Sequence, residues 1–225
     1  MDNTAATSKS ASKSAKIELT FLGFVSLLVG VLCMLDAHFV HGLSPLTSIS
    51  ESATTGNMAG MLLPFALGCM FTFTISYQGY CASERVITKI IGGGFAIVAM
   101  QVCDSPYVDE ARVGLLGLPP HVSGIVHLVG SGIGFGMMWV WVTFYFTRSD
   151  KEKSRQTKQK IIRNYIYIAC GAAMLCGLVM LVIGSFIDFG KYLVFIAEEF
   201  ILIPAGIAIL VKSGFFLADK TKNKE

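Results

Sequence analysis

Six long apolar segments follow one another along this chain of 225 residues. A bilayer core of roughly 30 Å takes about 20 helical residues to cross, and each segment is close to that length. The runs are continuously apolar and do not alternate with the period of a strand, so a β-barrel is not expected. The sequence therefore predicts an all-α, polytopic membrane protein, a bundle of six transmembrane helices. The helices are expected at about residues 17–40, 58–80, 84–103, 121–146, 161–184 and 191–216.

The first sixteen residues, MDNTAATSKSASKSAK, differ sharply from the rest of the chain. They are polar, rich in Ser and Ala, and lack the short apolar core and cleavage site of a secretory signal peptide. We expect residues 1–16 to form a disordered cytoplasmic tail and the first helix to act as the insertion signal. One membrane domain should then cover residues 17–217, followed by a cytoplasmic tail at residues 218–225.

The charged residues divide between the two sides of this predicted bundle. Of the eighteen Lys and Arg residues, only Arg112 and Lys191 fall in connections on one side, which leaves sixteen on the other. Lys and Arg near segment ends resist translocation, so the basic side and both termini should be cytoplasmic. The outward side receives all four His residues and many acidic ones, and any chemistry is expected there. The four are His38, His41, His121 and His127.

The connection at residues 148–163 is the most basic part of the chain, with seven Lys or Arg residues against Asp150 and Glu152. Such a cluster attracts anionic lipid headgroups by about 1 kcal/mol per basic residue near the surface. The same charges also serve as a topology signal. Nucleic-acid binding is not expected, because the net charge is only +3 and no recognition motif accompanies the cluster.

Glycine and cysteine have structural explanations in this sequence. Gly130 and Gly134 are four residues apart, a spacing that lets membrane helices approach closely. No strand precedes the glycines and no phosphate-binding Lys follows them, so a nucleotide loop is not expected. The six cysteines include no C-x-x-C pair, and we expect them to be free thiols.

Ionisable residues in the apolar segments are the strongest functional signal, because each costs several kcal/mol unless it meets a partner or water. Glu198 and Glu199 lie one to two turns into the last segment, about 100° apart on a helix, so at least one should point into the bundle. His127 lies six residues after His121, which places the two imidazoles on different faces.

Other outward polar residues lie at a similar expected depth. Glu51 and Asp104 are near the outer membrane boundary. Ser50 lies in the same loop as Glu51, which is the only charged residue of that loop. The loop hydroxyls can cap the next helix or bind a polar headgroup. The candidate polar pocket therefore comprises Ser50, Glu51, Asp104, His121, His127, Glu198 and Glu199.

Three kinds of chemistry fit these residues. A zinc ion held by residues such as His121, His127, Asp104 and Glu199 could lower the pKa of a bound water and hydrolyse a lipid ester or amide. A hydrogen-bonded His–Glu network could instead bind lipid or fix helix packing. Transport would require the same residues to face both sides in turn. No H-E-x-x-H or G-x-S-x-G motif favours the enzyme, and no catalytic residue is assigned.

Three short motifs resemble the six-helix DRAM/Frag/Sfk membrane family and its bacterial relatives. They are Ser48-Ile49-Ser50-Glu51, the H-x-x-x-x-x-H-L-x-G-S stretch from His121 to Ser131, and the Glu199-Phe200 pair. The resemblance spans nearly all six helices. It implies recurrent polar positions at Ser50, Glu51, His127 and Glu199, although Phe200 stands where Trp is more usual and Glu198 is an additional acid.

The resemblance implies a link to membrane lipid organisation or remodelling without implying a shared reaction. A more distant likeness to the CREST superfamily of membrane hydrolases, which use zinc, is an analogy of residue inventory only. We therefore expect an integral protein, in a bacterial plasma membrane, that binds or organises lipid through its outward pocket. The alternatives are a metal-dependent membrane hydrolase and a transporter.

Overall fold

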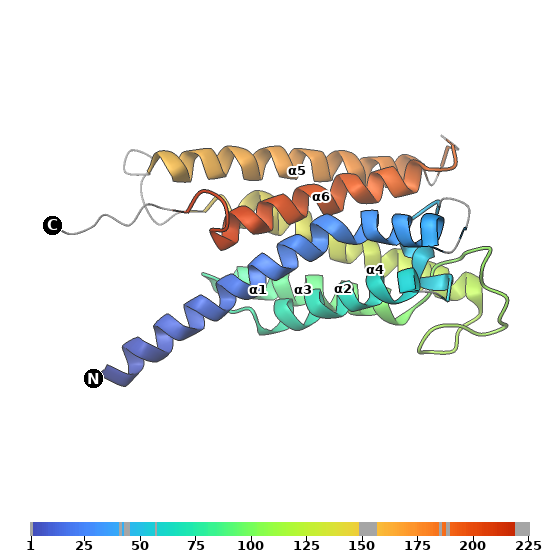
Figure 1. Cartoon of the computed structure of the whole chain (residues 1–225), viewed down its shortest axis with the longest axis horizontal. Helices are drawn as coiled ribbons and strands as arrows, with labels where there is room; N and C mark the ends of the chain where they lie inside the picture. Colours follow the sequence, from blue (N-terminus) through green and yellow to red (C-terminus); the bar gives the residue numbers. More distant parts are fainter. Residues whose placement is uncertain are drawn as a thin grey trace.

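In the computed structural model, the described residues contain helices and no strand, which confirms the all-helical prediction (Figure 1). The main helices are α1 (Asp2–Leu35), α2 (Met58–Ser76), α3 (Ala82–Met100), α4 (Pro120–Val140), α5 (Lys158–Gly184) and α6 (Leu193–Ser213). Two π-helical turns extend α1 and α4, and a short 3-10 helix precedes α2: η1 (Asp36–Val40), η3 (Trp141–Tyr145) and η2 (Ser50–Thr54). The structure describes residues 2–40, 42, 46–56, 58–148, 157–184, 186–187 and 190–218.

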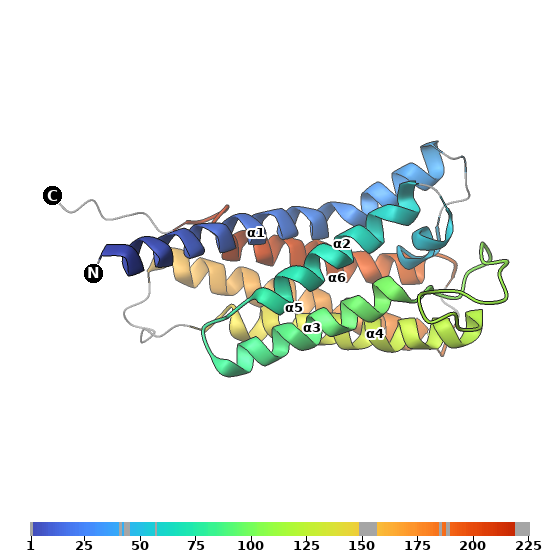
Figure 2. The same cartoon turned by 90° about the horizontal axis from the view of Figure 1, so that it is seen from below.

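Consecutive helices run antiparallel, so the connections alternate between the two ends of the bundle (Figures 1 and 2). The helix α1 packs on α2 and α6, α3 packs on α2 and α4, and α5 packs on α6 and η3. The last helix thus closes the bundle against the first. The core between the helices contains large buried side chains such as Phe95, Met138, Trp141, Met174 and Ile201.

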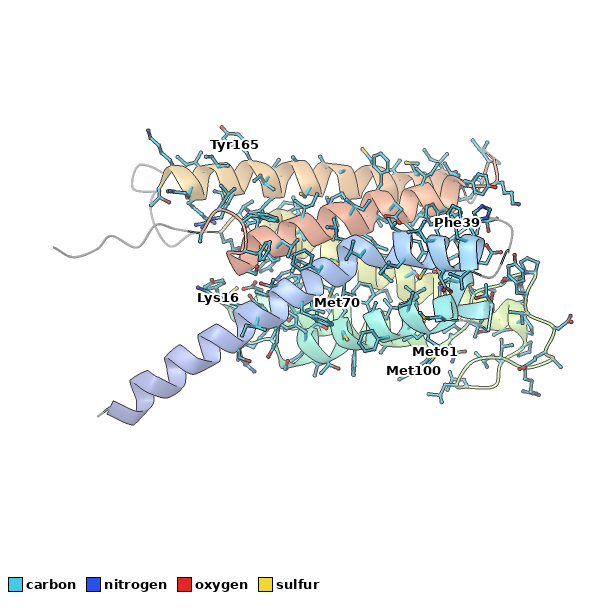
Figure 3. All side chains as sticks on the ribbon, in the orientation of Figure 1. Lys16, Phe39, Met61, Met70, Met100 and Tyr165 are labelled. Atoms are coloured by element: carbon cyan, nitrogen blue, oxygen red, sulfur yellow. The ribbon has the colours of Figure 1, made fainter. Side chains whose placement is uncertain are left out.

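The two ends of the bundle differ in charge. We call one the basic end, where α1 begins and α6 ends and where Lys16, Arg148 and Lys212 lie. The other is the acidic end, which holds η1, η2, the connection between α3 and α4, and the start of α6. Figure 3 shows Lys16 toward the basic end and Phe39 toward the acidic end. At 1.5 Å per helical residue these two positions are about 34 Å apart, slightly more than a bilayer core.

Four helical stretches are long and apolar enough to cross a membrane: Ser14–Val40, Pro120–Tyr145, Lys158–Gly184 and Leu193–Ser213. The apolar stretch of α2 is shorter, and α3 carries three charged residues in its first half. All six helices expose large apolar side chains, among them Phe65 at 61%, Leu128 at 62% and Val182 at 61%. A soluble monomer rarely exposes apolar surface so continuously, and this exposure is consistent with a helical membrane protein.

The predicted helix boundaries agree with the structure to within a few residues, except at the N-terminus. The helix α1 begins at Asp2 and so extends through the described part of residues 1–16, the segment expected to be a disordered cytoplasmic tail. The segment contains no Pro or Gly and is rich in Ala, the best helix former. Adding residues to an existing helix costs far less than nucleating one, so the apolar part of α1 can propagate backwards.

Helices α3 and α4 approach one another at glycines. A Cβ atom at Gly94 would lie 2.6 Å from the backbone nitrogen of Gly134 and 2.9 Å from the carbonyl oxygen of Gly130. A Cβ at Gly130 would in turn lie 2.7 Å from the side chain of Ile97. The predicted role of Gly130 and Gly134 in close helix packing is confirmed.

This contact leads to a prediction. Gly94→Ala should destabilise the protein by about 1–3 kcal/mol, because the added methyl meets the backbone of α4, which cannot move as a side chain can. The neighbouring Gly93 has no atom within 4 Å of its Cβ position, so Gly93→Ala is a matched control that should be neutral or slightly stabilising. Thermal unfolding of both variants in detergent is the measurement. Equal midpoints would contradict the proposed role of Gly94.

Candidate functional site

The loop before α2 is fixed to the start of α6 by Glu198. The backbone N–H of Ile49 and the hydroxyl of Ser50 both donate hydrogen bonds to the Glu198 carboxylate, the second at 3.1 Å. In the other direction, the N–H of Phe195 in the first turn of α6 donates to the Thr47 carbonyl at 3.0 Å. Glu198 is only 7% exposed, so it is one acid of the Glu198–Glu199 pair that points into the bundle, and it holds the loop there.

Glu51 organises the loop from within. Its carboxylate accepts hydrogen bonds from the N–H and the hydroxyl of Thr47 at 2.6 and 2.9 Å, while its own N–H donates to the Ser48 hydroxyl at 3.0 Å. This reciprocal pattern is a close relative of the capping box. Glu51 is only 5% exposed, and its hydrogen bonds are to residues of its own loop. Ser48 supplies the capping hydroxyl. Ser50 does not cap a helix, because its hydroxyl binds Glu198.

Glu199 faces the first helix. A Cβ at Gly30 of α1 would collide with the Glu199 carboxylate and would lie 2.6 Å from the Ile49 side chain. The absence of a side chain at Gly30 therefore makes the space that Glu199 occupies. The Oε1 atom of Glu199 is buried and has no hydrogen-bond partner within the described residues. Cys33 of α1 lies close enough to interact electrostatically with Glu198 and Glu199 of α6.

His127 ties α4 to the end of α3. Its Nδ1 atom lies 2.7 Å from the carbonyl oxygen of Gln101, and the ring is 6% exposed. Ser123, one turn earlier, accepts a hydrogen bond from the Val102 N–H and donates one to the Val102 carbonyl, at 3.1 and 2.9 Å. The Nε2 atoms of His127 and Gln101 are both buried and lack a partner in the part of the chain that the structure describes.

These two groups of residues meet at the acidic end. The hydroxyl of Thr54, in η2, donates to the hydroxyl of Ser105 at 2.9 Å and so joins the loop before α2 to the connection after α3. Cys103, beside Ser105, interacts electrostatically with Glu51 and Glu198. We call the combined set the acidic-end network, consisting of Ser48, Ser50, Glu51, Thr54, Gln101, Ser105, Ser123, His127, Glu198 and Glu199.

Two predicted pocket residues do not belong to this network. His121 and Asp104 are both exposed, although the backbone of Asp104 lies against α4, where a Cβ at Gly124 would be 3.1 Å from it. His121 occupies the first turn of α4 and therefore points away from His127, as the six-residue spacing predicts. His41, Asp188 and residues 149–156 of the basic connection lie outside the described residues.

The residues that are present do not fit the zinc site. Across the described ranges, no group of three or more His, Cys, Asp and Glu side chains is placed to hold a metal ion. The four suggested ligands are divided, since Glu199 faces α1, His127 faces the end of α3, and His121 and Asp104 are exposed. His121, His127, Asp104 and Glu199, suggested as possible zinc ligands, are therefore not brought together in this arrangement. All six cysteines lie within the described ranges, and none of them forms a disulfide.

A second polar cluster, at the basic end, was missed by the sequence analysis. Glu84 in the first turn of α3 is 1% exposed and accepts hydrogen bonds from the indole N–H of Trp141 at 3.0 Å and the N–H of Tyr80 at 2.7 Å. The ammonium of Lys212 lies 4.7 Å from the centre of the Tyr80 ring and 5.0 Å from that of Phe146. An acidic residue in the first turn of a helix was the available signal, and it indicates only a favourable helix end.

Basic residues at the described ends of the connection at residues 148–163 form contacts within the chain. Lys160 donates to the carbonyl oxygens of Phe146 and Arg148 at 3.1 and 3.0 Å, and Arg163 donates to that of Leu217 at 3.0 Å. Arg148 stacks over Tyr145 at 4.2 Å. Just before α3, hydrogen bonds to Ser83 and to the backbone lower the pKa of the Cys81 thiol.

No protein-family model matches this chain, and neither a curated protein nor a solved structure matches it significantly. The resemblance to the DRAM/Frag/Sfk family therefore stays a prediction from short motifs.

The role of Glu198 can be measured. Glu198→Ala should cost about 3 kcal/mol of loop stability, because the buried Ile49 N–H loses a charged acceptor. Hydrogen–deuterium exchange at residues 46–56 should become faster while exchange in α3 and α4 is unchanged. Ser50→Ala is the graded control, since it removes one donor and leaves the Ile49 bond intact. Unchanged exchange at Ile49 in Glu198→Ala would show that this carboxylate does not hold the loop.

Proposed function

We propose that this chain is a six-helix integral membrane protein that binds or organises membrane lipid, with the acidic-end network as the site that receives a lipid headgroup. In this proposal all six helices cross the bilayer, and the basic end with both termini faces the cytoplasm. A bacterial plasma membrane is the proposed location, on the strength of the short connections and the resemblance.

The observation that carries this proposal is the concentration of unpartnered buried polar atoms at the acidic end. Gln101 Nε2 is a donor, Glu199 Oε1 is an acceptor, and His127 Nε2 can be either, depending on its tautomer. A buried polar atom without a partner costs about 1–3 kcal/mol. A headgroup that carries both hydroxyl or ammonium donors and phosphate or carbonyl acceptors has the chemistry to pair with atoms of these kinds.

The site makes a direct prediction for lipid retention. Glu199→Gln and His127→Ala should each lower retention of the lipid bound at the acidic-end network about tenfold, as expected when one buried polar contact is lost. Native mass spectrometry from lipid-doped micelles is the measurement, beside thermal unfolding to confirm that the variants remain folded. His121→Ala is the matched control, because that imidazole is exposed and outside the network. Wild-type retention in both network variants would remove the proposed site.

The proposed topology has its own test. A small tag placed before residue 2 and another after residue 225 should both be labelled only after the inner face of the membrane is made accessible, since Lys and Arg at the basic end resist translocation. A tag in the connection between α3 and α4 should be labelled from outside in intact cells. Labelling of either terminus from outside would overturn the assignment of the basic end to the cytoplasm.

The two alternative functions receive less support from the geometry. Metal-dependent hydrolysis of a lipid has no assembled ligand set in the described residues. Transport would require Glu198 or His127 to change sides, whereas both hold adjoining backbone through hydrogen bonds at the acidic end. Anionic headgroups at residues 148–163 remain a proposed second contact with lipid, based on the charge of that connection.

A further inference from the structure

A groove of about 580 Å³ lies between α1 and α2, away from the acidic-end network. The two helices lie close together near η2 and diverge toward the basic end, as Figure 2 shows. Most of the groove wall is apolar, and four of the lining residues are Phe21, Leu22, Phe65 and Phe71. A volume of this size is typical of sites for small ligands.

The lining changes character along the groove. The apolar residues continue to the level of Phe65, while Glu18, Thr72 and Ser76 line the part nearest the basic end. The hydroxyls of Thr72 and Ser76 donate to carbonyl oxygens of their own helix, at 2.9 and 3.0 Å, so each still has lone pairs that can accept. The groove therefore has an apolar body and a polar mouth, which is the polarity of a lipid molecule.

The length of the groove corresponds to one leaflet. From Phe65 to Ser76 the helix α2 rises about 16 Å, which is close to half of a bilayer core of about 30 Å. Because the polar mouth is at the basic end, an acyl chain that enters the groove would belong to the leaflet on that side. Its headgroup would lie beside Glu18.

Charge selects the headgroup. Glu18 is the one charged residue that lines the groove in the described part of the chain, and its carboxylate is exposed and accepts a hydrogen bond from Ser14 at 3.0 Å. A carboxylate pairs with an ammonium through strong, charge-assisted hydrogen bonds and repels an anionic group. We propose that this groove binds an acyl chain of a phosphatidylethanolamine from the basic-end leaflet, with the headgroup ammonium at Glu18.

The absence of a side chain at Gly68 leaves space in the groove for the acyl chain. It lies on α2 between Phe65 and Phe71, and no atom is found within 4 Å of the position that its Cβ would occupy. A larger side chain at this position would extend into the groove without meeting another helix. Gly136 on α4 is also partly exposed with open space at its Cβ position, but it lies outside the groove.

The first test fills the groove. Gly68→Leu in the full-length protein should reduce the phosphatidylethanolamine retained in native mass spectrometry about tenfold, whereas Gly136→Leu should retain it as the wild type does. Both variants add the same side chain to a lipid-facing helix, so a general effect on helix stability should affect them alike. Wild-type retention in Gly68→Leu, or equal loss in both variants, would overturn the site.

The second test concerns the headgroup. The wild type should retain phosphatidylethanolamine in preference to phosphatidylglycerol from an equal mixture, and Glu18→Gln should abolish that preference because the amide is neutral. A preference that is unchanged in Glu18→Gln, or a wild type that prefers phosphatidylglycerol, would overturn the role of Glu18. His127→Ala should leave this preference intact, so failure of the acidic-end site and failure of the groove can be told apart.

Discussion

Lipid tails are as apolar as the helix surfaces they touch, so the association of these helices depends on close packing and buried hydrogen bonds rather than on a hydrophobic effect. The contact between the first and last helices is the clearest case. A Cβ at Gly206 of α6 would lie 2.8 Å from the carbonyl oxygen of Gly23, and the Ser26 hydroxyl donates to the Leu202 carbonyl at 2.8 Å. Without small residues at these positions α6 could not close the bundle against α1.

The same contact places the candidate site. Toward the acidic end of this contact, Gly30 of α1 leaves the space that the Glu199 carboxylate of α6 fills. The preceding residue of α6, Glu198, faces the loop before α2. Two adjacent acids thus serve different neighbours because successive helical positions differ by about 100°. Glu198 is satisfied by backbone and hydroxyl donors, whereas one oxygen of Glu199 has no donor among the described residues. Helix packing therefore decides which of the two acids remains available to a ligand.

Sequence patterns predicted what depends on hydropathy and spacing. The length of the apolar segments predicted the helices, and the four-residue spacing of Gly130 and Gly134 predicted their close packing. The cost of burying a charge predicted that at least one of Glu198 and Glu199 points inward. Patterns could not predict which partner a polar side chain meets. Glu51 is engaged by Thr47 and Ser48 through a loop conformation that no periodicity encodes, and the Glu84–Trp141 bond joins residues 57 positions apart. For the same reason, residues of suitable type did not imply a zinc site.

The two polar clusters suggest why the acidic end is the better place for a ligand. At the basic end Glu84 is surrounded by donors, since Trp141, Tyr77 and the Tyr80 N–H all bind its carboxylate, and Lys212 lies nearby. Such a cluster stabilises the fold, and its hydrogen-bonding groups are already paired within the protein. At the acidic end, His127 and Glu199 each bury an atom that the described residues do not satisfy. Each such atom lowers the stability of the fold unless a ligand supplies the missing hydrogen bond. Buried polar atoms without a partner are expected mainly where a protein binds a ligand.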